Sequence, residues 1–262
     1  MIKSIIAIVM LCAGVAGAQD MHQRMWDWME KAVDDPSMIT TWNLTVDDAA
    51  GKTITLPLRT GYDYDFVVDW GDGTTATVTA FDDADISHEY SSTGTKTVTM
   101  TGILGAWYFN NGGDCLKFKT VESWGDVRFT GLGLEHAFYG CVNATDFDDL
   151  PYIPITSLYG TWYNCYGLTT APDVDTLVLV ESLGYTWSIC SGLTTAPVLP
   201  SSSTALTTTT SAFNGVGSGM SGTVVELWDT NNFPNVTIFL NTFTGATGLT
   251  NYADIPDAWK GL

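Results

Sequence analysis

The sequence Leu168-Thr169-Thr170-Ala171-Pro172 recurs twenty-five residues later as Leu193-Thr194-Thr195-Ala196-Pro197. Both copies belong to a longer pattern of five units, each keyed on one aromatic residue. The key residues follow one another at spacings of 24, 25, 26 and 30, and they are Phe138, Trp162, Trp187, Phe213 and Phe243. A unit of this length cannot bury its apolar face alone, so neighbouring units stack and identical positions form ladders. The pattern predicts a solenoid over residues 106–262, closed by a C-terminal cap.

Three further positions repeat together with the key residue. The position four residues before the key residue holds Leu134, Leu158, Leu183, Thr209 and Phe239. The position six residues after it holds Ala144, Leu168, Leu193, Gly219 and Leu249. The position three residues after the key residue holds Cys141, Cys165, Cys190, Val216 and Ala246. Valine and alanine take the place of cysteine in the last two units, so the position requires a small apolar side chain, and buried cysteine behaves as one. We therefore expect reduced thiols, while a disulfide between neighbouring units stays open; no Cys-x-x-Cys or Cys/His spacing indicates zinc.

Residues 38–105 contain short β-type runs separated by turn residues. The runs predict six strands, at Ile39–Leu44, Lys52–Leu58, Asp65–Trp70, Thr75–Thr79, Ile86–Tyr90 and Thr95–Thr101. Phe66, Val68 and Trp70 alternate onto one face, as a half-buried antiparallel strand requires. Several short strands at this spacing favour a β-sandwich, so the predicted fold class is mainly β.

This region also carries a resemblance to a known family. The motifs Val68-Asp69-Trp70-Gly71-Asp72-Gly73-Thr74, His88-Glu89-Tyr90 and Gly94-Thr95-Lys96-Thr97-Val98 occur in this order. They resemble the polycystic-kidney-disease (PKD) domain, an extracellular immunoglobulin-like module. The resemblance implies a spacer or adhesive module rather than an enzyme.

The repeat units resemble a second family. The segments are Ala137-Phe138-Tyr139-Gly140-Cys141, Thr161-Trp162-Tyr163-Asn164-Cys165-Tyr166-Gly167-Leu168 and Trp187-Ser188-Ile189-Cys190-Ser191-Gly192-Leu193. They are similar to the M-F-x-G-C-x-x-L-x-x-x-P unit of BspA-like leucine-rich surface-protein repeats, over about residues 115–255. The resemblance implies a leucine-rich-repeat solenoid that recognises a protein or glycan on a cell surface. A PKD-like module before such repeats is associated with exported bacterial proteins and some bacteriophage structural proteins.

The N-terminal region predicts export. In residues 1–18, Lys3 precedes an apolar run that ends in Ala16-Gly17-Ala18, as in a secretory signal peptide. The run is too short to span a bilayer comfortably, so we expect no stable membrane span; a hydrophobic helix retained in an assembly is the alternative.

Residues 19–37 place apolar side chains at helical spacing and predict a docking segment. Its face either packs against the chain's own domain or contacts a partner, and it carries Met21, Met25, Trp28 and Met29.

The chain is acidic, with 10 Lys+Arg against 29 Asp+Glu and a net charge of −19. This balance excludes nucleic acid as a partner, since that requires a basic surface. Eight acidic residues and no basic one lie between Gly61 and Tyr90. Calcium suits oxygen-rich loops, but the spacing matches no EF-hand or RTX pattern, and turn aspartates bond their own backbone. We therefore expect a solvated acidic surface and no resident cofactor, with a calcium site in these loops as the alternative.

The sequence lacks the motifs of an enzyme. It has three histidines and no nucleophile elbow, H-E-x-x-H motif or P-loop. A glycosidase built on Asp146, Asp148 and Asp149 stays possible in principle, but these residues lie in a stretch that connects repeats. We expect His88 to be a packed, hydrogen-bonded residue and His136 to lie at the surface. The chain is therefore interpreted as a non-enzyme.

The binding candidates are surface tyrosines. Tyr139, Tyr163 and Tyr166 flank the ladder without repeating faithfully, which suits an exposed face for sugar stacking or a protein contact. The sequence thus favours an exported surface or secreted adhesion or recognition protein that binds a protein or glycan. The alternative is a structural subunit of a virion or extracellular filament, anchored through the N-terminal segment.

Overall fold

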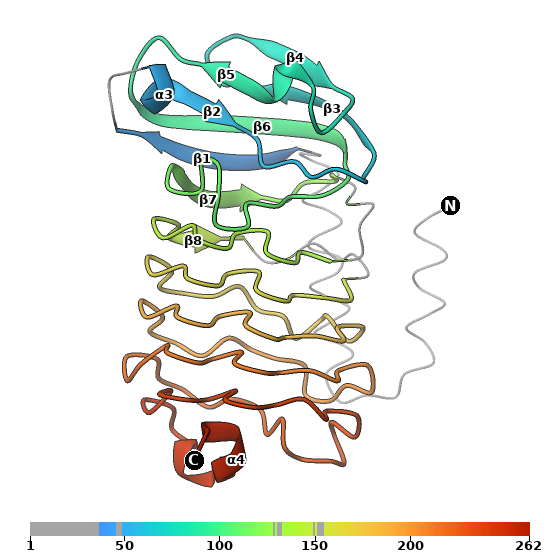
Figure 1. Ribbon diagram of the computed structural model, residues 1–262, viewed down its shortest axis with the longest axis vertical. Helices are drawn as coiled ribbons and strands as arrows, with labels where there is room; N and C mark the ends of the chain where they lie inside the picture. Colours follow the sequence, from blue (N-terminus) through green and yellow to red (C-terminus); the bar gives the residue numbers. More distant parts are fainter. Residues whose placement is uncertain (1–36, 46–48, 128, 130–132, 149, 151–154) are drawn as a thin grey trace.

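The computed structural model describes residues 37–45, 49–127, 129, 133–148, 150 and 155–262. These described residues are mainly β, with one mixed sheet and almost no helix, as the sequence predicts. The signal-peptide region and the docking face formed by Met21, Met25, Trp28 and Met29 lie outside the described residues. A strand-rich part stands on a stack of coils, and the short helix α4 (Asp257–Lys260) lies at the far end of the stack (Figure 1).

The main sheet has six strands in the order β4-β3-β6-β1-β7-β8. All neighbouring strands are antiparallel except β7 and β8, which are parallel. The strands are β1 (Met38–Leu44), β3 (Tyr64–Asp69), β4 (Thr75–Val78), β6 (Gly94–Leu104), β7 (Phe118–Ser123) and β8 (Asp146–Phe147). A two-stranded sheet pairs β2 (Thr53–Thr55) with β5 (Ser87–Glu89). The remaining short helices are α3 (Ala49–Lys52), η1 (Ala84–Ile86) and η2 (Tyr252–Asp254).

A strand forms in each of the six predicted runs, with two clear differences in length. The run Lys52–Leu58 narrows to β2, because the chain turns where the Leu58 N–H donates to the Leu56 carbonyl at 2.9 Å. Strand β6 instead continues to Leu104, which pairs with Tyr64 of β3. The main sheet also crosses the domain boundary that the sequence predicts after residue 105, since β1 lies before this boundary and pairs with β7, which lies after it.

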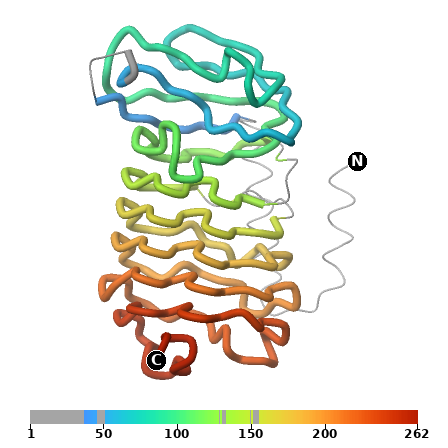
Figure 2. The backbone as a smooth tube through the Cα atoms, viewed as in Figure 1, coloured from blue at the N-terminus to red at the C-terminus, as the bar shows by residue number. Residues whose placement is uncertain are grey.

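The coils lie one on another in a stack (Figure 2). Backbone hydrogen bonds hold neighbouring coils in a fixed register. In each coil, the key aromatic residue and the residues four before, two before and two after it donate their N–H groups to the next coil. Across four successive coil boundaries these sixteen N···O distances lie between 2.7 and 3.0 Å. Parallel bridges follow the same register and join Gly133 to Ser157, Ser157 to Ser182, Ser182 to Thr208, and Thr208 to Ile238.

Two positions in each coil adopt the left-handed backbone conformation. The residues two before the key aromatic have φ between 54° and 62°, and they are His136, Gly160, Tyr185, Ser211 and Asn241. The residues two after it have φ between 59° and 84°, and they are Gly140, Asn164, Ile189, Gly215 and Gly245. Left-handed residues reverse the local course of the chain. The coil is therefore built on two repeated backbone bends, one on either side of the key residue.

The key aromatic residues form a buried stack, and all five are fully buried. Trp162 and Trp187 lie 5.8 Å apart between ring centroids, Trp187 and Phe213 5.0 Å, and Phe213 and Phe243 5.3 Å, with interplanar angles of 9°, 11° and 4°. Phe147 interrupts the first step, because its ring contacts Phe138 at 4.7 Å and Trp162 at 5.8 Å. Offset stacks of this kind add stability beyond the area that they bury.

The cysteines that the structure describes are free thiols in the core. The Cys165 thiol donates to the carbonyl oxygen of Phe138 at 3.2 Å, and the Cys190 thiol donates to that of Trp162 at 2.9 Å. Burial raises the pKa of the Cys190 thiol to about 12 and raises the pKa of Cys165 well above its usual value. The position thus holds a neutral thiol, as the substitution by Val216 and Ala246 predicts.

One predicted ladder position is wrong. The spacing assigns Gly219 to the position of Leu168 and Leu193, but Gly219 is exposed and Met220 is fully buried instead. The fourth unit has one extra residue between Val216 and Met220, so its core side chain comes one residue later. Gly219 takes the position of the glycine that precedes Leu168, Leu193 or Leu249 in the other units. The packing of the next coil agrees with this register, because a Cβ on Gly248 would contact the backbone at Ser218 and Met220, on either side of Gly219.

The left-handed backbone conformation two residues after the key residue leads to a testable prediction about stability. Ile189 is a β-branched residue with φ of 59°, where Asn164 stands one coil earlier and Gly215 one coil later. An L-residue pays about 1–2 kcal/mol for this conformation and glycine does not. We expect Ile189→Gly to raise the free energy of unfolding by about 1 kcal/mol, measured by urea denaturation.

The matched variant is Asn164→Ile, which places the branched side chain in the same position of the preceding coil. It should lower the free energy of unfolding by a similar amount, since asparagine tolerates this region better than isoleucine. Equal stability of both variants and the parent chain would contradict the role assigned to these bends.

Candidate functional site

A continuous row of half-buried rings lies on one side of the first coils. We call it the aromatic surface, and its members are Tyr108, His136, Tyr139, Tyr159, Tyr163 and Tyr185. Tyr139 and Tyr163 stack at 4.7 Å with an interplanar angle of 18°. Tyr185 contacts both Tyr163, at 5.8 Å, and Tyr159, at 5.5 Å. Four successive segments of the chain therefore contribute to one surface.

The register of the coils explains how these rings meet. Tyr139 and Tyr163 each follow a key aromatic residue, so they stack as the key residues do but on the outside of the coil. His136 and Tyr185 stand at the left-handed bend two residues before the key residue. In the coil that follows each of two rings, a glycine leaves space for that ring. A Cβ on Gly160 would lie 2.6 Å from the His136 ring, and one on Gly184 would lie 2.9 Å from the Tyr159 ring.

The aromatic surface carries almost no charge near neutral pH. Burial lowers the pKa of His136, and the nearby Arg59 lowers it further while Glu135 opposes this, so the imidazole is neutral at pH 7. Burial also raises the pKa of Tyr159 and Tyr163, so both keep their hydroxyl protons. The surface thus offers flat apolar faces with neutral hydrogen-bonding groups at their edges.

At its upper end the aromatic surface meets a hollow of about 190 Å³ between the strand-rich part and the stack. Its lining residues are Arg59, Tyr62, Ala106, Trp107, Tyr108, Gly133, Glu135, Thr156 and Ser157. Tyr108 belongs to both the hollow and the aromatic surface, and its ring lies 6.2 Å from that of His136. The hollow and the surface are therefore continuous.

The structure brings together two of the three predicted tyrosines. Tyr139 and Tyr163 stack on each other, whereas Tyr166 is exposed and has no ring contact with another described aromatic residue. Sequence reasoning missed Tyr159 and Tyr185, which stand at different positions of their units. It placed His136 at the surface without assigning it to a site. The glycines opposite the rings, Gly160 and Gly184, are the sequence signal that was available.

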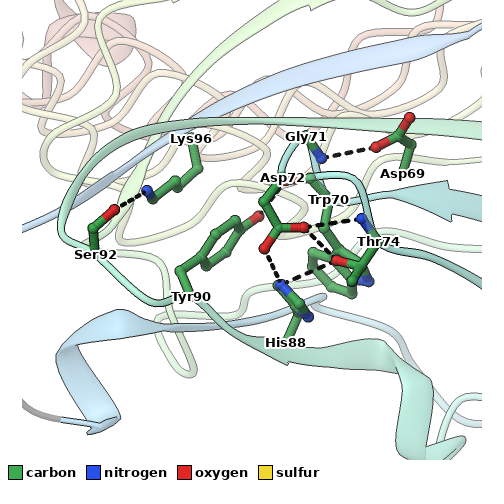
Figure 3. A network of polar contacts seen from close by, with 9 residues as sticks. All are labelled: Asp69, Trp70, Gly71, Asp72, Thr74, His88, Tyr90, Ser92 and Lys96. Carbon is green, nitrogen blue, oxygen red and sulfur yellow. Dashed lines mark hydrogen bonds and ion pairs between the residues drawn. The ribbon is translucent and has the colours of Figure 1, made fainter.

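His88 is part of a polar network at the hairpin between β3 and β4 (Figure 3). Its Nε2 lies 2.8 Å from Asp72 Oδ2 and 3.3 Å from Thr74 Oγ1, and its ring stacks on Trp70 at 5.1 Å. Asp72 and Thr74 contact the same ring nitrogen. Because a catalytic relay needs the carboxylate and the nucleophile on opposite nitrogens, this arrangement acts as a structural clasp, as predicted for His88.

The acidic loops of this region use several carboxylates to bond their own turns. Asp69 accepts a hydrogen bond from the Gly71 N–H at 2.8 Å, and Asp83 accepts one from the Asp85 N–H at 3.1 Å. Among the residues that the structure describes, no three His, Cys, Asp or Glu side chains gather as a metal site requires. The absence of a cofactor stays a prediction.

Comparisons of the chain with protein-family models, with curated proteins and with solved structures find no match. Within the described residues, no helix has the length and apolar character needed to cross a membrane. The function is therefore argued from the site itself.

The clasp predicts a pH-dependent contribution to stability. Hydrogen bonds from the Thr74 hydroxyl and from His88 lower the pKa of Asp72 from 3.8 to about 2. A lowered folded-state pKa contributes stability above the unfolded value, and this contribution is lost as the pH falls through 2. Asp72→Asn should therefore lower the free energy of unfolding at pH 7, by at most about 1 kcal/mol because solvent screens this partly exposed side chain.

The measurement is urea denaturation of both chains between pH 7 and pH 2. The difference between them should stay constant down to about pH 4 and then shrink, as Asp72 itself becomes protonated. Asp82→Asn, at an exposed aspartate of the same region, is the control and should match the parent chain throughout. A difference for Asp72→Asn that is independent of pH would refute the assignment.

Proposed function

We propose that the chain is an exported surface or secreted recognition protein that binds its partner through the aromatic surface of its repeat array. The observation that carries the proposal is the stacked pair Tyr139 and Tyr163 inside a row of six half-buried rings. Aromatic side chains supply large contact area at low cost in conformational entropy, and they dominate the binding energy of many interfaces. A monomeric protein with no ligand has no need to assemble such a row at its surface.

The same proposal assigns the finer fold. We take the strand-rich part to be a PKD-like, immunoglobulin-like sandwich, and the stack to be a BspA-like leucine-rich-repeat solenoid. The hairpin after Trp70, closed by the hydrogen bond from the Trp70 N–H to the Thr74 carbonyl at 3.0 Å, supports the first assignment. The in-register parallel bridges from Gly133 to Ile238 support the second. In this arrangement the sandwich is a spacer and the solenoid is the recognition element.

We further propose that the chain is not an enzyme and that it acts outside the cell or at a cell surface. His88 is committed to the clasp with Asp72 and Thr74. Asp146, the first of the candidate glycosidase carboxylates, accepts a hydrogen bond from the Phe147 N–H at 3.0 Å within strand β8. Adhesion needs a preformed surface and no reactive group. The aromatic surface is such a preformed surface.

The test measures binding of the full chain to immobilised glycans and to a panel of intact cells. We expect the parent chain to bind, and the double variant Tyr139→Ala/Tyr163→Ala to bind roughly tenfold or more weakly, because truncated aromatic anchors cost at least 2 kcal/mol. Both side chains lie outside the key-residue stack, so the variant should stay folded, with a lower unfolding midpoint because the half-buried ring contacts are lost.

Phe81→Ala is the matched control, since Phe81 is an exposed aromatic residue of the strand-rich part. It should bind like the parent chain. Undiminished binding by the double variant would refute the assignment of recognition to the aromatic surface. Filaments or particles of the native protein in electron micrographs, together with no binding to glycans or cells, would favour a structural subunit instead.

A further inference from the structure

The hollow at the upper end of the aromatic surface has a built-in set of hydrogen-bond donors. Arg59 lies in the loop between β2 and β3, and the buried Tyr64 hydroxyl fixes that loop. This hydroxyl accepts from the Arg59 N–H at 2.9 Å and donates to the Arg59 carbonyl at 2.8 Å. The guanidinium stands over the Tyr108 ring at 4.4 Å and lies 5.7 Å from the Tyr62 ring. Its position is therefore set before any ligand arrives.

The donors of Arg59 are available to a ligand. A cation–π contact engages the flat face of the guanidinium and leaves its N–H groups, which point outward in the plane of the group. No carboxylate of the described residues forms an ion pair with Arg59. It is the single arginine in the described part of a chain of net charge −19, so its lack of a carboxylate partner is unexpected.

Trp107 lines the same hollow as an apolar wall. It is only 2% exposed, and its ring packs among Trp42, Phe109 and Phe118. Its indole Nε1 is buried, so it offers no donor to a ligand. The charged donor of the hollow is therefore Arg59.

The hollow also presents acceptors and apolar walls. Glu135 is exposed at its rim, and the hydroxyl groups of Thr156 and Ser157 both donate and accept. Tyr62 and Tyr108 contribute their rings. One positive and one negative side chain leave the hollow with no net charge. The matching ligand is a ring with an apolar face and several neutral hydroxyl groups, which accept from Arg59 and donate to Glu135.

We infer that this hollow binds one sugar ring of a neutral glycan, whose neighbouring rings lie along the aromatic surface. The inference rests on the proposed recognition function and names its ligand class. An acidic glycan fits less well, because the Glu135 carboxylate and the strongly negative chain repel it. A volume of about 190 Å³ lies below the roughly 300–1,000 Å³ of sites for drug-sized ligands, so the hollow holds one ring rather than a chain.

The test screens the full chain on an array that carries both neutral and sialylated oligosaccharides. The best neutral oligosaccharide is then titrated by calorimetry against the parent chain and two variants. Arg59→Met keeps the aliphatic stem and removes the guanidinium donors, and Glu135→Gln keeps the size of the side chain and removes the carboxylate acceptor. We expect affinity to fall by about 10- to 100-fold for Arg59→Met and by about tenfold or less for Glu135→Gln.

Lys96→Met is the matched control, since Lys96 stands over the Tyr90 ring at 4.9 Å in the strand-rich part and is remote from the hollow. It should bind like the parent chain, and the unfolding midpoints of all three variants verify that they are folded. Because Glu135 is exposed, Glu135→Gln leaves the core unchanged and keeps the test decisive even where Arg59→Met unfolds.

The remaining outcomes separate this inference from the proposed function. Neutral glycans that bind the parent chain and both variants equally, but not Tyr139→Ala/Tyr163→Ala, overturn the hollow as a sugar site and leave the recognition function standing. A preference for sialylated glycans overturns the ligand class. Binding to cells through a protein, with no glycan bound on the array, also overturns the inference. Absence of all binding overturns both proposals.

Discussion

The backbone hydrogen bonds between neighbouring coils are the constraint on which the rest of the structure depends. Each coil donates from alternate positions around its key aromatic residue, and the left-handed bends on either side keep these N–H groups directed at the next coil. A slip of one residue would move every ladder side chain to the other face and break the bonds together. The fixed register is therefore what stacks Trp162 on Trp187 inside the coil and Tyr139 on Tyr163 outside it.

Such a ladder has two open ends, and each end is closed by a different device. At the upper end β7 pairs with β1, so the main sheet continues from the first coils into the strand-rich part. At the lower end the Phe243 N–H donates to the Trp259 carbonyl at 2.9 Å, and the Trp259 ring stacks on Phe239 at 4.4 Å. Closed ends prevent pairing with other chains. The hollow lies where the loop of Arg59 meets residues of the first coils, and the Tyr64 hydroxyl holds that loop.

The sequence predicts those features that depend on the type of side chain. The key aromatic residues and the cysteines repeat as residue types, so their burial follows from spacing alone. The left-handed bends do not repeat as residue types, since histidine, glycine and tyrosine occupy the same position in His136, Gly160 and Tyr185. Only the backbone shows them. For this reason Tyr163 was predictable as a surface ring, whereas Tyr159 and Tyr185 were not.

Two further differences have similar physical causes. The extra residue before Met220 shifts one ladder position, and an insertion in a bend leaves no mark in the pattern of apolar residues. The hollow joins Arg59 and Tyr108, which lie 49 positions apart in the sequence. They meet because β3 pairs with β6 and the Tyr108 N–H donates to the Pro57 carbonyl at 2.8 Å. Contacts that depend on how two parts of a chain are joined do not follow from the local pattern of either part.

Charge completes the argument about what the surface accepts. Eleven acidic residues and no basic one lie between Glu135 and Asp257, so the stack repels polyanions within a Debye length of about 8 Å. Along the aromatic surface itself, burial lowers the pKa of His136 and raises the pKa of Tyr159 and Tyr163, so these three groups are neutral near pH 7. The acidic background selects against charged partners, and the neutral row of rings supplies the attraction. Selection by repulsion and attraction together is how a surface of low charge gains specificity.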